Sequence, residues 1–230
     1  MARSTDTFAL ADFDSHGAVG AALERLPTRA RFLRGAAGGA TVFGALVLRP
    51  VVAAAQTSSG DIAILNFALT LEYLQAAFYS EAERIGKLQG PLAEQASVVG
   101  AHERAHVAGF QAALGSSAVK EPSFNFHGVT EQPDSFRATA VAFEDLAVAA
   151  YKEQLPKIQS PKYLATAVAI HSVEARHAAW IRRLANVVPA EHAFDDPLPN
   201  SKTVEIVNST HFVTLQTPQT SAERRPGFTG

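Results

Sequence analysis

The sequence predicts an all-α fold, a four-helix bundle made of two helical hairpins joined by a long crossover. Between residues 61 and 187, four stretches repeat apolar residues every three or four positions, which is the period of an amphipathic helix. The motif Glu-x-x-His occurs twice, at Glu103–His106 and at Glu174–His177, and it places a carboxylate and an imidazole on one helix face. A signal segment is expected before this bundle and an irregular tail after it.

The first predicted hairpin has two helices joined by a short turn. Its first helix keeps the apolar period from Ile62 until Gly86, and Asp61 is placed to help cap the N-terminal end of this helix. Its second helix keeps the period from Leu92 until Gly115. Because the turn between them is short, we expect the two helices to be antiparallel neighbours.

The second predicted hairpin follows a longer connection. Residues 116–133 have no helical period and are numerous enough to cross the bundle. The third helix begins near Pro133 and is stopped by Pro156. The fourth helix starts at Ser160-Pro161, which supplies an N-cap and a proline in the first helical position, and it ends before Pro189.

Six residues at core positions of these helices form a candidate set of metal ligands. Each hairpin supplies a glutamate from its first helix and a Glu-x-x-His pair from its second. The set is Glu72, Glu103, His106, Glu144, Glu174 and His177. In four-helix bundles such a set holds two metal ions about 3.5 to 4 Å apart. The alternative is a salt-bridged or proton-sharing polar core, but four buried carboxylates without cations would each cost several kcal/mol.

An internal repeat relates the two hairpins. Glu72 and Tyr79 recur as Glu144 and Tyr151, at nearly the spacing that separates the two Glu-x-x-His motifs. The duplication indicates pseudo-two-fold symmetry, which suits a dinuclear site. Each tyrosine is either a core aromatic residue or a donor of a hydrogen bond to a ligating carboxylate of a neighbouring helix. We expect His171 at the core or rim. The histidines expected at the surface are His16, His102, His127, His192 and His211.

Composition limits the chemistry that the chain can perform. The 230 residues are 47% hydrophobic, which is enough for a substantial core. A formal net charge of -2 gives no reason to expect nucleic acid as a partner. Because cysteine is absent, disulfides, thiolate zinc sites, iron–sulfur clusters and thiol nucleophiles are excluded. Any bound metal must therefore have nitrogen and oxygen ligands.

Residues 1–55 are predicted to be a leader and an export signal. A basic cluster at residues 28–34, an apolar run at 35–48 and the small residues Ala53-Ala54-Ala55 form the three parts of such a signal. Cleavage near Ala55 would leave no stable membrane anchor, and the mature protein would be periplasmic or extracellular. Arg29-Ala30 stands where a twin-arginine signal has two arginines, so the twin-arginine and general secretory routes both stay open. A retained amphipathic segment is the alternative.

Residues 188–230 are predicted to be an extended C-terminal tail. Three prolines follow the bundle closely, and the stretches 204–207 and 211–213 are rich in β-branched and aromatic residues, which favours a short hairpin. No fifth helix is therefore expected. This expectation counts against a 24-subunit cage and leaves a smaller homo-oligomer open.

The order Glu, Glu-x-x-His, Glu, Glu-x-x-His, the long crossover and the Glu-x6-Tyr pairs resemble the ferritin-like superfamily over residues 61–187. The presence of both Glu-x-x-His motifs makes the site more similar to bacterioferritin and rubrerythrin than to classical ferritins. The exported, cysteine-free form most resembles the ferritin-like proteins grouped with desiccation-related proteins. The resemblance implies a di-iron or di-manganese centre. In it Glu72 and Glu144 are terminal ligands, Glu103 and Glu174 bridge the metals, and His106 and His177 each complete one metal.

The resemblance also implies an oxidoreductase of the ferroxidase, peroxidase or catalase-like kind, whose metal pair reacts with O2 or H2O2 in oxidative or desiccation stress. The chain departs from rubrerythrin because it lacks the cysteines of a rubredoxin-type domain. A second hypothesis is a structural stress-protection protein in which the metal pair stabilises the bundle. A third is substrate oxygenation, which requires a pocket beside the metals.

Overall fold

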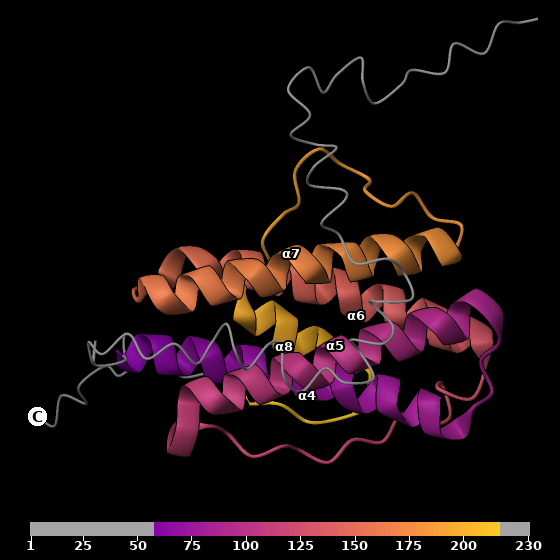
Figure 1. Cartoon of the computed structure of the whole chain (residues 1–230), viewed down its shortest axis with the longest axis horizontal. Coiled ribbons are helices and arrows are strands. Elements are labelled where there is room, and N and C mark those ends of the chain that lie inside the picture. The colour runs from indigo at the N-terminus through magenta and orange to yellow at the C-terminus, as the bar shows by residue number, and fades with distance from the viewer. Residues whose placement is uncertain (1–57, 217–230) are drawn as a thin grey trace, which may run out of the picture. The chain divides into compact units, whose positions relative to one another are not determined.

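The computed structural model describes residues 58–216, and all regular secondary structure in this range is helical (Figure 1). The expected export signal lies outside the described residues. Four long helices form the bundle: α4 (Ser59–Ile85), α5 (Gly90–Leu114), α6 (Pro133–Gln154) and α7 (Pro161–Leu184). These bounds confirm the all-α prediction and agree closely with the four helices expected from the apolar period.

The helices pack as two hairpins. α4 packs against α5 and α6 packs against α7, and Figure 1 shows the α6–α7 pair above the α4–α5 pair. The segment 118–132 contains no helix or strand and runs along the length of the bundle, below α4 and α5 in Figure 1. The side chain of Asn66 on α4 holds its start by hydrogen bonds to Ser117 O and Val119 N, at 2.9 and 2.8 Å. This segment is the predicted crossover.

Two apolar clusters form the core, and the Glu-x-x-His motif of α5 lies between them along the helix. Apolar residues of 92–99 belong to the first cluster, and those of 110–114 belong to the second. The first cluster is rich in aromatic rings. Phe78 stacks on Phe136 with the ring centroids 4.9 Å apart and the planes at 5°. Packing of this kind supplies the main stabilisation of a bundle, and it surrounds the polar motifs with apolar side chains.

Asp61 differs from its expected role. Ser58 caps α4 instead, because its side-chain oxygen accepts the amide of Asp61 at 3.0 Å. The Asp61 carboxylate is buried and accepts the backbone amides of Gln159 and Ser160, both at 2.9 Å. Those amides lie at the start of α7, where free N–H groups and the helix dipole favour a negative charge. Asp61 therefore joins the two hairpins.

The C-terminal region also differs from the prediction. Residues expected to be extended form a fifth helix, α8 (Asn200–Ser209). Val204 and Val207 are buried in the first apolar cluster together with Phe212, so burial against the bundle decides the conformation of a short valine-rich run that resembles a strand in sequence. The absence of a fifth helix thus no longer argues against a 24-subunit cage, and the oligomeric state stays a prediction.

Among the described residues, α4 alone is long and apolar enough to cross a membrane. The 18-residue window responsible is 67% buried inside the bundle. A central helix of a bundle is apolar on most of its surface for the same reason. Its composition is therefore explained by burial in the core and is only weak evidence for a membrane span.

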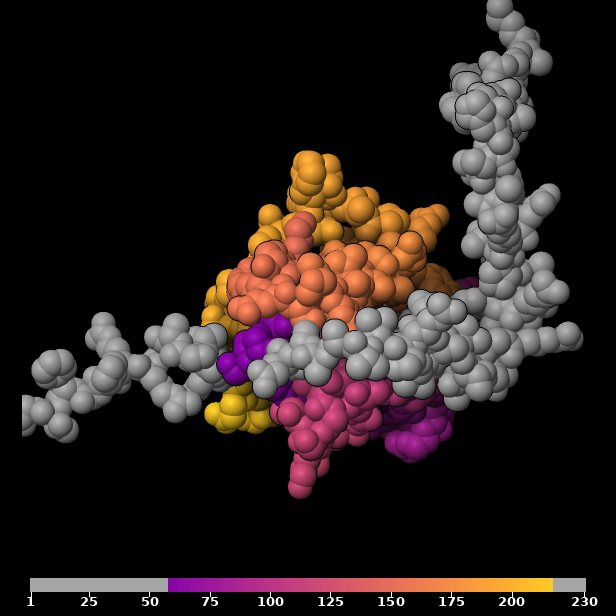
Figure 2. Space-filling view, turned by 60° about the vertical axis from the view of Figure 1, so that its left-hand side comes forward, coloured from indigo at the N-terminus to yellow at the C-terminus, as the bar shows by residue number. Residues whose placement is uncertain are grey.

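The segment between α7 and α8 stands out from the bundle at the top of Figure 2. It encloses a cavity of about 280 Å³ with α6 and α7, and Asp145, Arg182 and Asp195 are among the lining residues. None of the six candidate ligands lines this cavity. It therefore gives no support to a substrate pocket beside the metals.

Candidate metal centre

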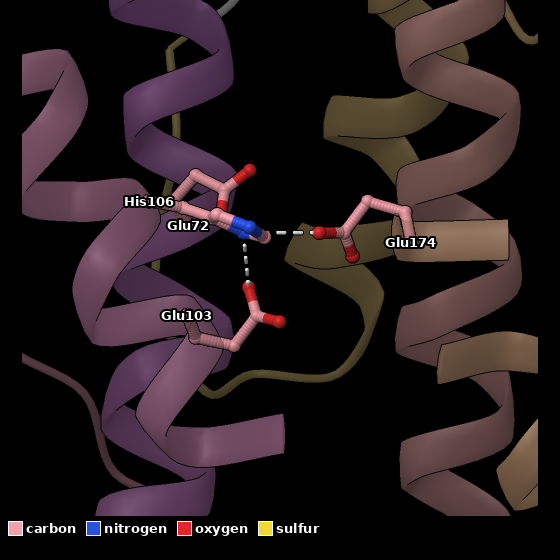
Figure 3. A group of neighbouring side chains, drawn as sticks. All are labelled: Glu72, Glu103, His106 and Glu174. Carbon is pink, nitrogen blue, oxygen red and sulfur yellow. Dashed lines mark hydrogen bonds and ion pairs between the residues drawn. The ribbon is translucent and has the colours of Figure 1, made fainter. Parts of the chain in front are cut away.

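The six candidate ligands meet in the middle of the bundle. The four glutamates are fully buried, and the two histidines are 4% and 3% exposed. Figure 3 shows four of them: Glu72 from α4, and Glu103 and His106 from α5, all of which point toward Glu174 on α7 across the bundle. The helical period that placed these residues on core faces thus brings them to one site.

The six residues form two overlapping groups of four. Within each group, one ligand atom from every residue lies within 4.8 Å of the others. The first group is Glu72, Glu103, His106 and Glu174, and the second is Glu103, Glu144, Glu174 and His177. Glu103 and Glu174 belong to both groups. The arrangement therefore has two halves that share two carboxylates.

Each imidazole turns its Nδ1 atom toward three carboxylates. His106 Nδ1 lies 3.1 Å from Glu72 Oε2, 3.1 Å from Glu174 Oε1 and 3.6 Å from Glu103 Oε2. His177 Nδ1 lies 3.0 Å from Glu103 Oε1, 3.5 Å from Glu174 Oε2 and 3.6 Å from Glu144 Oε2. One nitrogen and several oxygens are thus directed at a common point in each half.

Several of these atoms lack hydrogen bonds within the described part of the chain. They are both carboxylate oxygens of Glu103 and of Glu174, Oε2 of Glu144 and Nδ1 of His177. The 3.0 Å contact between His177 and Glu103 does not have hydrogen-bond geometry. A buried acceptor without a partner costs about 1 to 3 kcal/mol. Carboxylate oxygens and imidazole nitrogens are ligands that iron, manganese and zinc accept, so the cluster fits a metal site.

The charges of the cluster do not balance without cations. Burial raises the pKa of Glu103 and of Glu144. Burial opposes ionisation of Glu174 too, but the adjacent imidazoles of His106 and His177 prevail and lower its pKa to about 2. Four carboxylates face at most two imidazolium groups, so protons or metal ions must neutralise the remainder.

The histidines of the cluster hold their protons tightly in the metal-free protein. Burial lowers the pKa of His106, but the carboxylates of Glu72, Glu103 and Glu174 together raise it more, and the result lies well above the usual value. Burial likewise disfavours charge on His177, yet the carboxylates of Glu103, Glu144 and Glu174 raise its pKa to about 12. A metal ion would therefore compete with protons for both Nδ1 atoms.

Tyr79 and Tyr151 each bridge to the other hairpin. The Tyr79 hydroxyl donates to Glu144 Oε1 at 2.5 Å, and the Tyr151 hydroxyl donates to Glu72 Oε1. Burial raises the pKa of both hydroxyls, so both keep the proton that they donate. Each bond fixes one oxygen of a glutamate, and the second oxygen faces the histidine of the cluster, His106 for Glu72 and His177 for Glu144. From the sequence, each tyrosine could be either a core aromatic residue or a donor to a ligating carboxylate, and the structure shows the second role.

A glycine lets α5 approach α4 next to Tyr79. A Cβ atom at Gly100 would lie 2.9 Å from the Cβ of Tyr79 and 2.5 Å from Glu83 Oε1. Both distances are shorter than side-chain contacts in proteins allow. The missing side chain therefore permits the close helix packing that aims Tyr79 at Glu144.

His102 was expected at the surface, and this expectation is wrong. It is partly buried, and its Nδ1 lies 2.9 Å from Nε2 of His177. Burial and the neighbouring His177 lower the pKa of His102 to about 4. Helical spacing could not indicate this contact, because the partner His177 lies on another helix, α7. His171, which was expected at the core or rim, is partly buried and belongs to neither ligand group.

Comparison with known proteins agrees with this geometry. The family model described as Ferritin-like domain matches residues 60–187, more than half of the chain. The chain belongs to this ferritin-like family. No curated protein matches its sequence.

Proposed function

We propose that the cluster holds two iron or manganese ions and that the loaded protein reacts with O2 or H2O2. The observation that carries the proposal is the sharing of Glu103 and Glu174 between two ligand groups. Two carboxylates common to two sets of donors suit a pair of adjacent ions, because each carboxylate has an oxygen for either ion. Glu72 and His106 would complete one half.

The donor count supports reactivity. In each half, one imidazole nitrogen, two shared carboxylates and one terminal carboxylate supply four donor atoms, one from each residue. Iron and manganese in carboxylate surroundings commonly take six ligands. The six residues therefore leave coordination positions for a small molecule, whereas a purely structural site fills all positions with protein atoms.

When bound at these six residues, a reduced metal pair would supply two electrons, one from each ion, for the conversion of one H2O2 and two protons to two molecules of water. The protein's own residues have other tasks. Tyr79 and Tyr151 hold the terminal carboxylates in place through their hydroxyl groups. The apolar clusters on either side exclude bulk water. Repeated turnover requires an external reductant or a second H2O2 that is oxidised to O2.

A second cavity of the bundle lies beside Tyr151. An apolar cavity lined by Leu65, Tyr151 and Ala167 has a volume of about 10 Å³, which is roughly one water-sized sphere. None of the six ligands lines this cavity, so it does not identify a substrate. Because neither this cavity nor the larger one beside Arg182 borders the ligands, neither supports substrate oxygenation, and we prefer reaction with O2 or H2O2.

The second candidate function is a structural stress-protection protein whose metal ions only stabilise the bundle. Complete burial of all four glutamates favours this candidate, because a structural site needs no access for solvent. Anaerobic reduction of the iron and manganese forms, followed by addition of O2 or H2O2, separates the two functions. The redox function predicts a spectral change and loss of peroxide. If both metal forms stay unchanged, the structural function remains.

Removal of either bridging hydroxyl should slow the reaction more than it weakens the fold. In Tyr79→Phe or Tyr151→Phe, the ring still fills the core, but Glu144 or Glu72 loses the group that orients it. We expect a loss of about 10- to 100-fold in activity or metal affinity. Stopped-flow spectroscopy and thermal melts measure the two effects. Tyr73→Phe on α4, whose hydroxyl bonds Val119 O instead, is the matched control. Loss of stability with an unchanged rate would contradict the orienting role.

We also propose that the protein is exported, as residues 1–55 suggest. The mature chain should begin near Gln56, just before α4. Export through the twin-arginine route would allow metal loading before transport. N-terminal sequencing of the protein from its own host decides the matter. Recovery of intact Met1 from the cytoplasm would rule out export.

A further inference from the structure

The two ring nitrogens of His177 face different surroundings. Nδ1 lies within 3.6 Å of oxygens of Glu103, Glu144 and Glu174, whereas Nε2 lies 2.9 Å from Nδ1 of His102. Coordination through Nδ1 requires its lone pair, so the remaining ring proton must be on Nε2. That proton points at His102, whose Nδ1 must then accept it.

The internal repeat breaks at this position. The register that carries His106 onto His177 carries His102 onto Val173. Valine has no hydrogen-bonding side chain, so α7 does not offer His106 the partner that α5 offers His177. The two halves of the cluster have matching ligand residues but differ in the residue at the position of His102, which is Val173 in the other half.

We propose that His102 is a positioning residue that fixes the tautomer and ring orientation of His177 and makes the two metal positions unequal in affinity. The inference rests on the proposed dinuclear centre. A hydrogen-bond acceptor on the outer nitrogen keeps Nδ1 free and makes it a better ligand. The His102 ring lies nearly parallel to that of His177, at 18°, with the centroids 5.2 Å apart. The His177 half therefore binds its ion more tightly than the His106 half.

Titration of the metal-free protein with Mn²⁺ or Co²⁺, followed by calorimetry, tests this inequality. The parent should show two binding steps. His102→Val, which copies the residue of the other half, should weaken the tighter step by about 10- to 100-fold and leave the weaker step nearly unchanged. His102→Gln can still accept the proton through its side-chain oxygen and should recover most of the affinity. Circular dichroism checks that the variants fold.

Two unchanged steps in folded His102→Val would overturn the role of His102 and leave the metal centre intact. Equal weakening of both steps would overturn it too, because that result indicates a general loss of packing. A parent that binds neither ion overturns the proposed centre itself, and this inference with it. Long-range ¹H–¹⁵N NMR of the metal-free protein tests the hydrogen bond directly. His102 should carry its proton on Nε2, and a proton on its Nδ1 would refute the assignment.

Discussion

Replacement of Glu103 or Glu174 by alanine should remove both metal ions, whereas loss of a residue that serves one half should remove one. Both glutamates belong to the two ligand groups, and their oxygens lack other partners in the described part of the chain. An ion present at 1,000 times its Kd stabilises the folded state by about 4 kcal/mol. For a chain of this size that corresponds to a fall of about 8 to 16 °C in Tm for each ion lost.

Metal analysis and thermal melts of the loaded proteins measure these effects. The matched control is Glu94→Ala, which removes an exposed glutamate from the same helix, α5. Metal-free Glu103→Gln should be at least as stable as the metal-free parent at pH 7, because burial raises the pKa of Glu103 and its ionised form therefore destabilises the fold. Two ions and an unchanged Tm in Glu103→Ala and Glu174→Ala would refute the shared role.

Metal binding at pH 7 should release protons, and the affinity should rise with pH. The pKa of His177 is raised to about 12 and that of His106 also lies well above its usual value, so both are protonated before metal arrives. Coordination through Nδ1 displaces a proton from each. Each displaced proton makes the affinity about tenfold stronger per pH unit, since one pKa unit corresponds to about 1.4 kcal/mol.

Calorimetry in two buffers with different protonation enthalpies counts the released protons. His192→Gln, which changes an exposed histidine, should leave the count unchanged. A binding enthalpy that does not depend on the buffer would contradict the assignment of Nδ1 as ligand.

The folding stability of the metal-free protein should depend on pH, because the pKa values of His177 and Glu174 are shifted by folding. His177 has a raised pKa, so its contribution is fully present below about 6.5 and disappears as the pH rises through about 12. Glu174 has a lowered pKa, so its contribution is present above about 4.5 and disappears as the pH falls through about 2. Ionised Glu174 and protonated His177 therefore both contribute fully to stability between about pH 4.5 and pH 6.5. Removal of metal should move the pH of greatest stability toward this acidic range.

The six cluster residues could be predicted because each follows from local spacing. An apolar period identifies the inward face of a helix, and a glutamate or histidine in that face must be buried. The repeat then indicated which residues are equivalent. The structure adds their mutual contacts, such as the position of His106 Nδ1 among oxygens of Glu72, Glu103 and Glu174.

Other features depend on contacts between distant segments, which spacing does not encode. His102 follows no core period, and its partner lies on another helix. Asp61 lies in the first turn of α4, but its carboxylate caps α7. α8 has a short valine-rich sequence that fits a strand equally well, and only burial against the bundle makes it helical.

The metal content of the protein purified from its native host tests the proposed centre most directly. Elemental analysis beside protein quantitation should give about two iron or manganese ions per chain, because two ligand groups share Glu103 and Glu174. The double variant Glu103→Ala/Glu174→Ala should give none. A parent that contains no iron or manganese, and that gains no thermal stability when either metal is supplied, would contradict the dinuclear centre and leave a polar core in its place.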